Sequence, residues 1–133
     1  MNAPADHAAL MPFAAAIGIT ITDATPGEVT GQLAWSDDRT TAGGVMHGGA
    51  LMTLADSTAA VCAVLNLPAG ATTSTTSSST VFVRGVRSGI VTATARPLHV
   101  GRSTIAVTTE LRDDDGRLVA QVTQSQAVFA QSS

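Results

Sequence analysis

The run from Gly43 to Leu65 constrains the fold of this chain more than any other segment. It reads GGVMHGGALMTLADSTAAVCAVL, which is a glycine-rich turn followed by a long apolar helix. Asp56 is the only charged side chain between Ala50 and Leu65. A helix that is apolar on nearly all sides is expected to be buried on most of its faces. One helix, from about His47 to Leu65, can be buried in this way only if a curved antiparallel sheet wraps around it.

Segments in which apolar and polar residues alternate lie on both sides of this helix, as such a sheet requires. Two of them precede the helix and are joined by a turn at Pro26-Gly27, and about four follow it. A further turn is expected at 113–116. The predicted strands are Ile17–Thr22, Glu28–Trp35, Thr72–Arg84, Gly89–His99, Ser103–Arg112 and Arg117–Phe129.

The remaining segment lies at the N-terminus. A short helix is expected over His7–Ala16, broken or kinked at Pro12. By its length the chain is one domain. The sequence therefore predicts a single α+β domain over residues 1–133, in which five to six antiparallel strands surround one long helix and residues 1–16 form an N-terminal helical segment.

Composition excludes several classes of function. The net charge is -3 and only 3% of residues are aromatic, so neither a basic surface nor stacking platforms for nucleic acid are expected. The apolar run 50–65 is shorter than the roughly 20 residues that span a bilayer, and it contains Asp56. No basic leader precedes the apolar part of the N-terminus, so we expect a soluble, cytoplasmic protein without a membrane partner.

The single cysteine, Cys62, excludes a disulfide within the chain. Its apolar neighbours indicate a small buried side chain rather than a nucleophile, which would need an accessible, electropositive setting. No group of His, Cys, Asp and Glu has the spacing of a metal site. His7, His99 and Trp35 are interpreted as surface or packing residues.

The helix carries two features that suggest chemistry, about two helical turns apart. His47, Gly48 and Gly49 come at its start, where free backbone N–H groups and the positive end of the helix dipole favour developing negative charge. Asp56 lies inside the apolar run, where a carboxylate is costly unless it is paired or used. The structural alternatives are a helix cap for His47, a tight turn for the glycines and a hydrogen-bonded buried carboxylate for Asp56.

The stretch HGGALMTLADSTAA resembles the central motif of acyl-CoA thioesterases of the phenylacetate-degradation type, in which HGG precedes a helix that carries an Asp. The later segments VFVRGVRSG and RPLHVGRS follow in the order seen in that family, so the resemblance covers about 17–130. It implies the hotdog fold, two subunits joined edge to edge with the active site at their interface, and commonly a homotetramer. It also implies hydrolysis of an acyl-CoA thioester to a carboxylic acid and free CoA, without a metal or redox cofactor.

The resemblance also implies roles for individual residues. Asp56 corresponds to the catalytic carboxylate, acting as general base or nucleophile. Gly48 corresponds to the glycine whose backbone N–H polarises the thioester carbonyl, and His47 to the histidine that orients the loop or the carbonyl. Thr41 stands where several relatives have Asn, but it lacks an amide's separate donor and acceptor.

Further residues are expected to bind substrate. Some relatives hold the attacking water with a hydroxyl just after the helix, a place that Thr73, Ser74 and Thr75 all approach; Ser74 is our choice for the catalytic one. The phosphates of CoA need cationic or N–H partners, and the candidates around the central and later strands are Arg84, Arg87, Arg96 and Arg102. Of these, Arg84 and Arg102 are the predicted ligands, with solvated strand-end charges as the alternative. The remaining predicted substrate contacts are Gly49, Thr41, Thr73 and Thr75.

Two other functions are compatible with the pattern. A hotdog hydratase or dehydratase usually pairs its Asp with a His further along the same motif, whereas here His47 precedes Asp56 and no His follows on the helix. A non-catalytic acyl-CoA binding module would bind the ligand without releasing a thiol. Measurement of thiol release from acyl-CoAs distinguishes both from a thioesterase.

Overall fold

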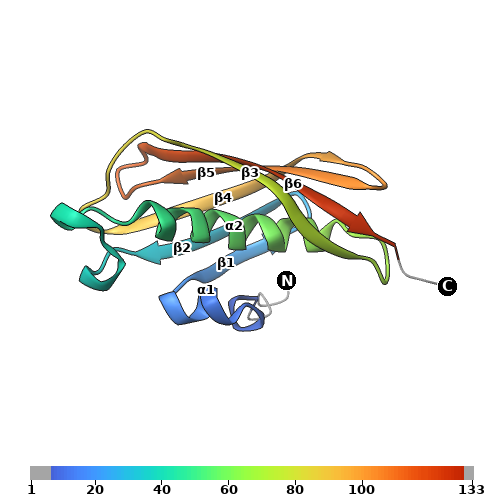
Figure 1. Ribbon diagram of the computed structural model, residues 1–133, viewed down its shortest axis with the longest axis horizontal. Helices are drawn as coiled ribbons and strands as arrows, with labels where there is room; N and C mark the ends of the chain where they lie inside the picture. Colours follow the sequence, from blue (N-terminus) through green and yellow to red (C-terminus); the bar gives the residue numbers. More distant parts are fainter. Residues whose placement is uncertain (1–6, 131–133) are drawn as a thin grey trace.

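The computed structural model describes residues 7–130. Its centre is the long helix α2 (Gly48–Leu65), and a six-stranded antiparallel sheet curves around it (Figure 1). The strands are β1 (Thr20–Thr25), β2 (Glu28–Ala34), β3 (Thr72–Phe82), β4 (Ile90–Val100), β5 (Thr104–Arg112) and β6 (Leu118–Phe129). Their order in the sheet is β1-β2-β4-β5-β6-β3, so β1 and β3 are the edges. The predicted α+β hotdog architecture, with two strands before the helix and four after it, is confirmed.

The N-terminal segment differs in detail from the prediction. A 3-10 turn, η1 (Ala8–Leu10), precedes α1 (Pro12–Ile17), and Pro12 occupies the first turn of α1, where its missing N–H costs nothing. Gly18 ends α1 in the left-handed conformation, with φ of 95°. The strand predicted from Ile17 therefore begins only at Thr20. Residues 1–6 of the predicted N-terminal segment lie outside the described residues.

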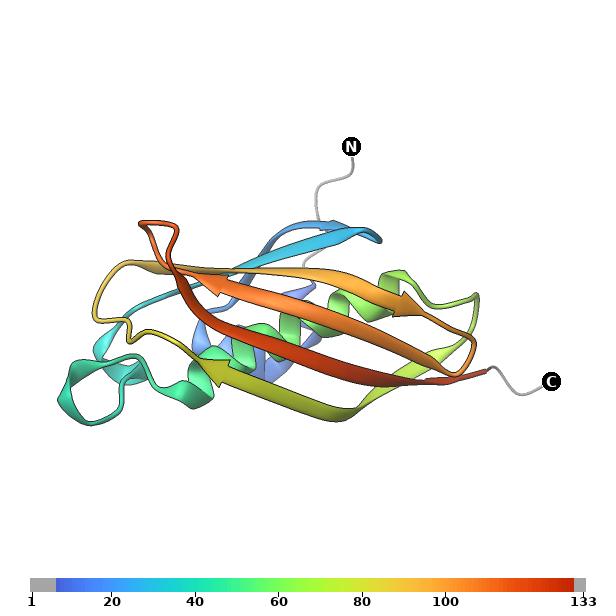
Figure 2. The same ribbon diagram turned by 90° about the horizontal axis from the view of Figure 1, so that it is seen from above.

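The connection between β2 and α2 contains the short turns η2 (Asp37–Arg39) and η3 (Ala42–Gly44). Figure 2 shows this connection projecting at one end of the molecule, beyond the start of α2. Trp35 is half-buried at its start, and its indole N–H donates to the Gly44 carbonyl at 3.0 Å. Gly43 and Gly44 both have positive φ, which allows the tight turn. The Trp35–Gly44 hydrogen bond therefore holds the loop back against the end of β2, from which the chain continues into α2.

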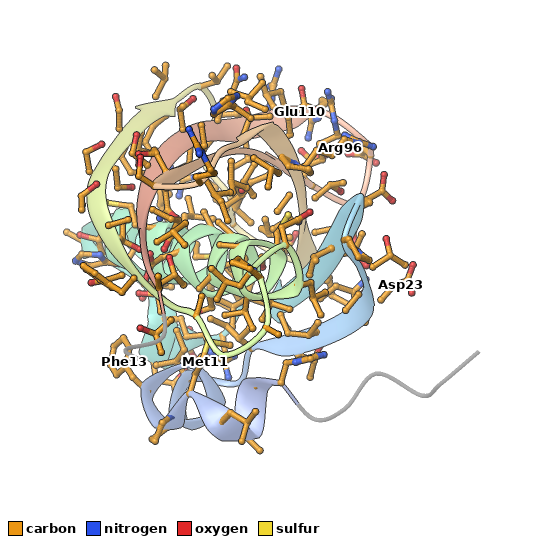
Figure 3. The ribbon with its side chains drawn as sticks, turned by 90° about the vertical axis from the view of Figure 1, so that its right-hand side faces the viewer. Met11, Phe13, Asp23, Arg96 and Glu110 are labelled. Atoms are coloured by element: carbon orange, nitrogen blue, oxygen red, sulfur yellow. The ribbon has the colours of Figure 1, made fainter. Side chains whose placement is uncertain are left out.

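The core lies between α2 and the concave face of the sheet, as the view along the helix in Figure 3 shows. Small residues on α2, including Ala55 and Ala59, are fully buried and let the helix approach the apolar strands β4 and β5 closely. Cys62 is also fully buried, as predicted. By length and composition alone α2 could cross a membrane, but half of it is buried as the core helix of this domain.

The expectation that α2 is buried on nearly all sides is wrong for one face. Gly49, Met52, Asp56 and Val64 are exposed, and they follow one another along a single stripe of the helix. The reason is that the sheet ends at β3, whose outer edge has no strand partner among the described residues. We call this stripe the open face of α2.

Candidate active site

His47 is the N-cap of α2. Its backbone is extended, with φ of -62° and ψ of 134°, and its carbonyl accepts the N–H groups of Ala50 and Leu51. Its Nδ1 accepts the Gly49 N–H at 2.8 Å. A neutral imidazole with an accepting Nδ1 carries its proton on Nε2. The structural role as a cap is therefore present, and Nε2–H remains as a donor on the exposed side of the ring.

Gly48 is the first residue of α2, and its N–H has no hydrogen-bond acceptor in the part of the chain that the structure describes. A free N–H at this position points out of the helix and favours negative charge. The Phe82 ring lies against Gly48 so closely that a Cβ would come within 3.2 Å of its Cζ. Thr41, Phe82 and Arg84 surround the same space, which we call the Gly48 hollow.

Asp56 lies on the open face of α2, so the prediction that it is buried is wrong. The wrapping sheet stops short of this side and leaves the carboxylate exposed. Its Oδ1 accepts a hydrogen bond of 2.8 Å from Nε2 of Gln124 on β6. Met52, Thr53 and Ser78 line the hollow around it, which we call the Asp56 hollow. The carboxylate is thus held from one side and accessible from the other.

The three hydroxyl residues singled out from the sequence lie elsewhere. Thr73 and Thr75 bond to Gln126, at 3.2 and 2.7 Å. With Ser74 they line a different hollow, beside Ala60. The hydroxyl in the Asp56 hollow is that of Ser78. The structure thus places Ser78, rather than Ser74, beside the carboxylate.

A β-bulge explains the difference. β3 pairs with β6 as Thr75↔Gln126 and then as Ser77↔Ser125, so Thr76 is an extra residue. A bulge of this kind reverses which residues of a strand face the core. Ser78 therefore lies opposite Gln124 and faces α2, which simple alternation along β3 does not reveal.

The sequence interpretation also missed Gln124 and Gln126. Each is only 1% exposed, on the face of β6 that packs against α2. The alternation in β6 does indicate that both glutamines are buried. Val122, Gln124 and Gln126 lie two residues apart and so face the same side of the strand, and Val122 is an ordinary core residue. Two glutamines in the apolar phase of a strand predict buried amides, which require partners.

The four arginines separate into two pairs. Arg87 donates to the Gly43 carbonyl at 2.8 Å, and Arg96 pairs with Glu28 at 2.7 Å. Within the described residues, no partner is found for the side chains of Arg84 and Arg102. The two predicted CoA ligands are therefore the two whose guanidinium groups are available to bind a ligand. They lie at opposite ends of the sheet.

The separation of these two arginines follows from their neighbours on β6. The Arg84 N–H bonds to Val119, and Ser103, next to Arg102, accepts from Val128. Nine residues of strand correspond to about 30 Å. The two arginines of one chain therefore cannot bind the same phosphate group.

Gly48 and Asp56 of one chain cannot act on the same thioester. They lie eight residues apart on the helix, which is about 12 Å along its axis. The Gly48 N–H also points towards the N-terminal end of α2 and hence away from Asp56. The two groups line different hollows. A donor and an attacking group each need to lie about 3 Å from the reacting carbonyl, so one chain carries two halves of such a site.

Other groups are unsuited to the chemistry. Burial raises the pKa of the Cys62 thiol to about 11, so the thiol is protonated near neutral pH. No group of three or more His, Cys, Asp or Glu side chains among residues 7–130 could hold a metal ion. His99 lies exposed on β4, far along the sheet from the start of α2.

Comparison with known proteins decides the family. The family model described as "Thioesterase superfamily" matches residues 43–120, which include the start of α2, Asp56 and the strands β3, β4 and β5. The chain belongs to the thioesterase superfamily. Among its relatives, a protein of Mycobacterium tuberculosis named as a candidate esterase is 31% identical over 123 residues, covering 90% of this chain and 88% of that protein. A second candidate esterase, from Vibrio cholerae, is 40% identical over 76 residues, which span 57% of this chain and 51% of the relative.

Solved structures agree with the thioesterase assignment. A thioesterase variant from Pseudomonas aeruginosa superimposes with a TM-score of 0.89 at 26% identity, covering 96% of both chains. A thioesterase from Haemophilus influenzae gives a TM-score of 0.83 at 25% identity, covering 88% of this chain and 82% of that one. These likenesses support a hotdog hydrolase that acts on thioesters, and they identify α2 as the core helix of a thioesterase domain.

Proposed function

We propose that this thioesterase hydrolyses an acyl-CoA to a carboxylic acid and free CoA, with each active site shared between two subunits. Gly48 of one subunit would supply the carbonyl-binding N–H, and Asp56 of the partner subunit would supply the carboxylate. The observation that carries the proposal is that α2 presents an unpaired N–H and an accessible carboxylate that cannot meet within one chain.

The geometry of the edge strand supports a homodimer. β3 has a free edge and lies beside the open face of α2, so a second copy joined along β3 would also approach that face. The end of β3 is apolar and exposed, with Val81 at 62% and Phe82 at 50% exposure, and Val83 follows at 56%. Apolar surface of this kind next to a free strand edge favours association. We propose that two such dimers form a homotetramer.

In the proposed reaction the thioester oxygen accepts the Gly48 N–H, which polarises the carbonyl. Asp56 of the partner subunit takes a proton from water, and the resulting hydroxide attacks the carbonyl carbon. Negative charge that develops on the oxygen is stabilised by the N–H and by the positive end of the α2 dipole. The C–S bond then breaks, and CoA leaves as a thiolate that takes up a proton. Direct attack by Asp56, followed by hydrolysis of the anhydride, is the alternative route to the same products.

Substrate contacts follow from the hollows. Arg84 and Thr41 line the Gly48 hollow, where Arg84 is suited to a phosphate of CoA. His47 Nε2–H and Gly49 lie beside the start of α2 and are suited to orienting the thioester. The hollow beside Ala60, which Val61 and Val64 line, lies one turn beyond Asp56 and is suited to the acyl group. Arg102 lies at the other end of the sheet from Arg84, so it could bind CoA only in a site completed by the partner subunit.

The reaction needs no cofactor beyond the CoA of its substrate. We propose a cytoplasmic location, which suits an acidic chain whose only cysteine is buried and reduced. Nucleic acid is not a partner in this proposal, because the net charge is -3. A membrane is not a partner either, because α2 is packed as the core helix of the domain.

The decisive experiment is thiol release from a panel of aryl, short-chain and long-chain acyl-CoAs. Asp56→Asn should lower kcat by a factor of about 10² to 10⁴, because it removes the base without changing size. Asp23→Asn is the matched control, since Asp23 is an exposed carboxylate on β1 (Figure 3). Wild-type turnover that survives in Asp56→Asn would refute the assigned role. Tight binding of acyl-CoA without thiol release would identify a binding module instead.

A further inference from the structure

Two buried amides lie directly beneath the open face of α2. Gln124 and Gln126 are each 1% exposed, and both project from β6 towards the helix. Burying a primary amide is costly unless its donors and acceptor are all bonded. Each of the two amides therefore needs hydrogen-bond partners inside the core, and these bonds join the two glutamines into one network.

The network has a direction. An ionised carboxylate only accepts hydrogen bonds, so the Gln124 group that faces Asp56 Oδ1 at 2.8 Å must be the NH₂. The Gln124 Oε1 then faces the other way and accepts from Gln126 Nε2 at 3.0 Å. Gln126 Nε2 donates also to Thr75 Oγ1 at 2.7 Å. Its Oε1 lies 3.2 Å from the Thr73 hydroxyl, which also contacts the Ala127 carbonyl at 2.7 Å. The bonds from Asp56 to Gln124 and from Gln124 to Gln126 thereby determine the orientation of both amides.

We propose that Gln124 is a positioning residue for Asp56, and that Gln126 keeps the Gln124 amide turned the correct way. This inference rests on the proposed function. Asp56 lies on an exposed helix face, where a short side chain would otherwise change rotamer freely. Gln124 occupies Oδ1 and leaves Oδ2 as the free oxygen. The free oxygen then has a defined direction from which to take the proton of water or attack the carbonyl carbon.

The contacts of Gln124 account for both of its donors. One N–H goes to Asp56, and the second lies 3.4 Å from Ser78 Oγ in the same hollow. Ser78 Oγ is thereby held beside the carboxylate, with its own proton free for an acceptor.

The test compares three variants with wild type. Gln124→Met keeps the length of the side chain and removes the donor. It should lower kcat by up to about 10²-fold, as misplacement of a reacting group does, with KM unchanged. Gln121→Met is the matched control, because Gln121 belongs to the same strand but is exposed. It should leave kcat and KM unchanged.

Gln124→Glu gives a readout that a purely structural role would not produce. At higher pH two carboxylates face each other and Asp56 loses its donor. At lower pH such a pair holds one shared proton, which restores a donor to Asp56. The kcat of this variant should therefore be highest at a more acidic pH than that of wild type. The groups facing Asp56 in the single chain are Gln124 and Ser78, and neither titrates in this range.

Measurement of the Asp56 rotamer separates failure of this inference from failure of the proposed function. NMR couplings of the Asp56 Cβ protons should show one rotamer in wild type and averaging in Gln124→Met. If wild type hydrolyses no thioester, this measurement alone still decides whether Gln124 positions Asp56. If Asp56→Asn is inactive while Gln124→Met keeps its kcat and its single rotamer, the positioning role is overturned and the thioesterase proposal stands.

Discussion

At the residue scale, the two halves of the proposed site depend on different parts of their residues. Gly48 would act through its backbone N–H, whereas Asp56 would act through its side chain. His47 caps the helix by accepting the Gly49 N–H at Nδ1, and within residues 7–130 the Gly48 N–H has no acceptor. The site can therefore be tested by substitutions that remove a backbone donor without unfolding the helix.

Gly48→Pro removes the N–H at a position where proline is tolerated. Gly48 is the first residue of α2, and His47 before it already has the extended backbone that precedes proline. The loss of one oxyanion donor should lower kcat by about 10² to 10³. Gly48→Ala is the control, since it places the same Cβ against Phe82 and keeps the N–H. Equal activities of the two variants would show that the N–H has no catalytic role.

Cys62 should be unreactive in the folded protein. It is fully buried, and burial raises its pKa to about 11, so hardly any thiolate exists at pH 8. We expect no reaction with a disulfide reagent such as Ellman's reagent under native conditions and one equivalent in denaturant. This property also keeps the protein's own thiol from interfering with the assay of CoA release. Rapid labelling of the native protein would contradict the assigned burial.

At the element scale, α2 and β3 together determine which side chains around Asp56 are accessible to a substrate. The helix supplies Asp56 and Ala60 on one stripe, and the bulge at Thr76 turns Ser78 towards that stripe. The hairpin between β5 and β6 lies at the end of the sheet where α2 begins, beside the first residue of β4, and a carboxylate holds its turn. Asp113 accepts the N–H groups of Asp115 and Arg117, each at 3.0 Å.

This hairpin gives a prediction on pH. Desolvation raises the pKa of Asp113, but the backbone N–H groups and the Arg117 charge outweigh it and hold the pKa below its ordinary value of 3.8. A lowered native pKa stabilises the fold above the unfolded value and loses that effect as the pH falls through the native one. Asp113→Asn should therefore lower the Tm near neutral pH, and the difference from wild type should shrink below about pH 4. Thermal unfolding between pH 2.5 and pH 7 measures it, and a difference independent of pH would contradict it.

At the scale of the whole molecule, the free edge of β3 and the open face of α2 lie on the same side. A single chain leaves both uncovered, together with the apolar side chains at the end of β3. One association along this edge would cover all three features and would bring the two halves of the site together. Both the separation of Gly48 from Asp56 and the exposed apolar end of β3 therefore favour a dimer.

Subunit complementation tests this arrangement. Asp56→Asn and Gly48→Pro, each expected to have a strongly lowered kcat alone, should regain activity when they are mixed, unfolded and refolded together. A mixed dimer would have one intact site, so random assembly should restore about a quarter of the wild-type activity. Refolded single variants are the controls. Absence of recovery, with mixed dimers demonstrated by tagging, would show that the site is not shared between subunits.

Much of the fold was predictable from the sequence, because local periodicity determines it. The apolar run 50–65 predicts the long core helix, although not its open face, and the alternating segments predict five to six strands in their observed chain order. The error at Ile17 arose because an isoleucine followed by glycine reads equally as a strand or as a helix end. The candidates Gly48 and Asp56 came from the motif and its spacing, and no property of the folded chain was needed to select them.

The sequence by itself determined the elements and the candidate residues Gly48 and Asp56, since propensity, periodicity and motif spacing are local properties. Only the tertiary structure decided which face of α2 stays open, and hence that Asp56 is exposed. It also decided that Gln124 contacts Asp56 across 68 residues and that a bulge brings Ser78 rather than Ser74 to it. These features depend on strand register and on where the sheet ends, which arise from contacts between segments distant in the chain.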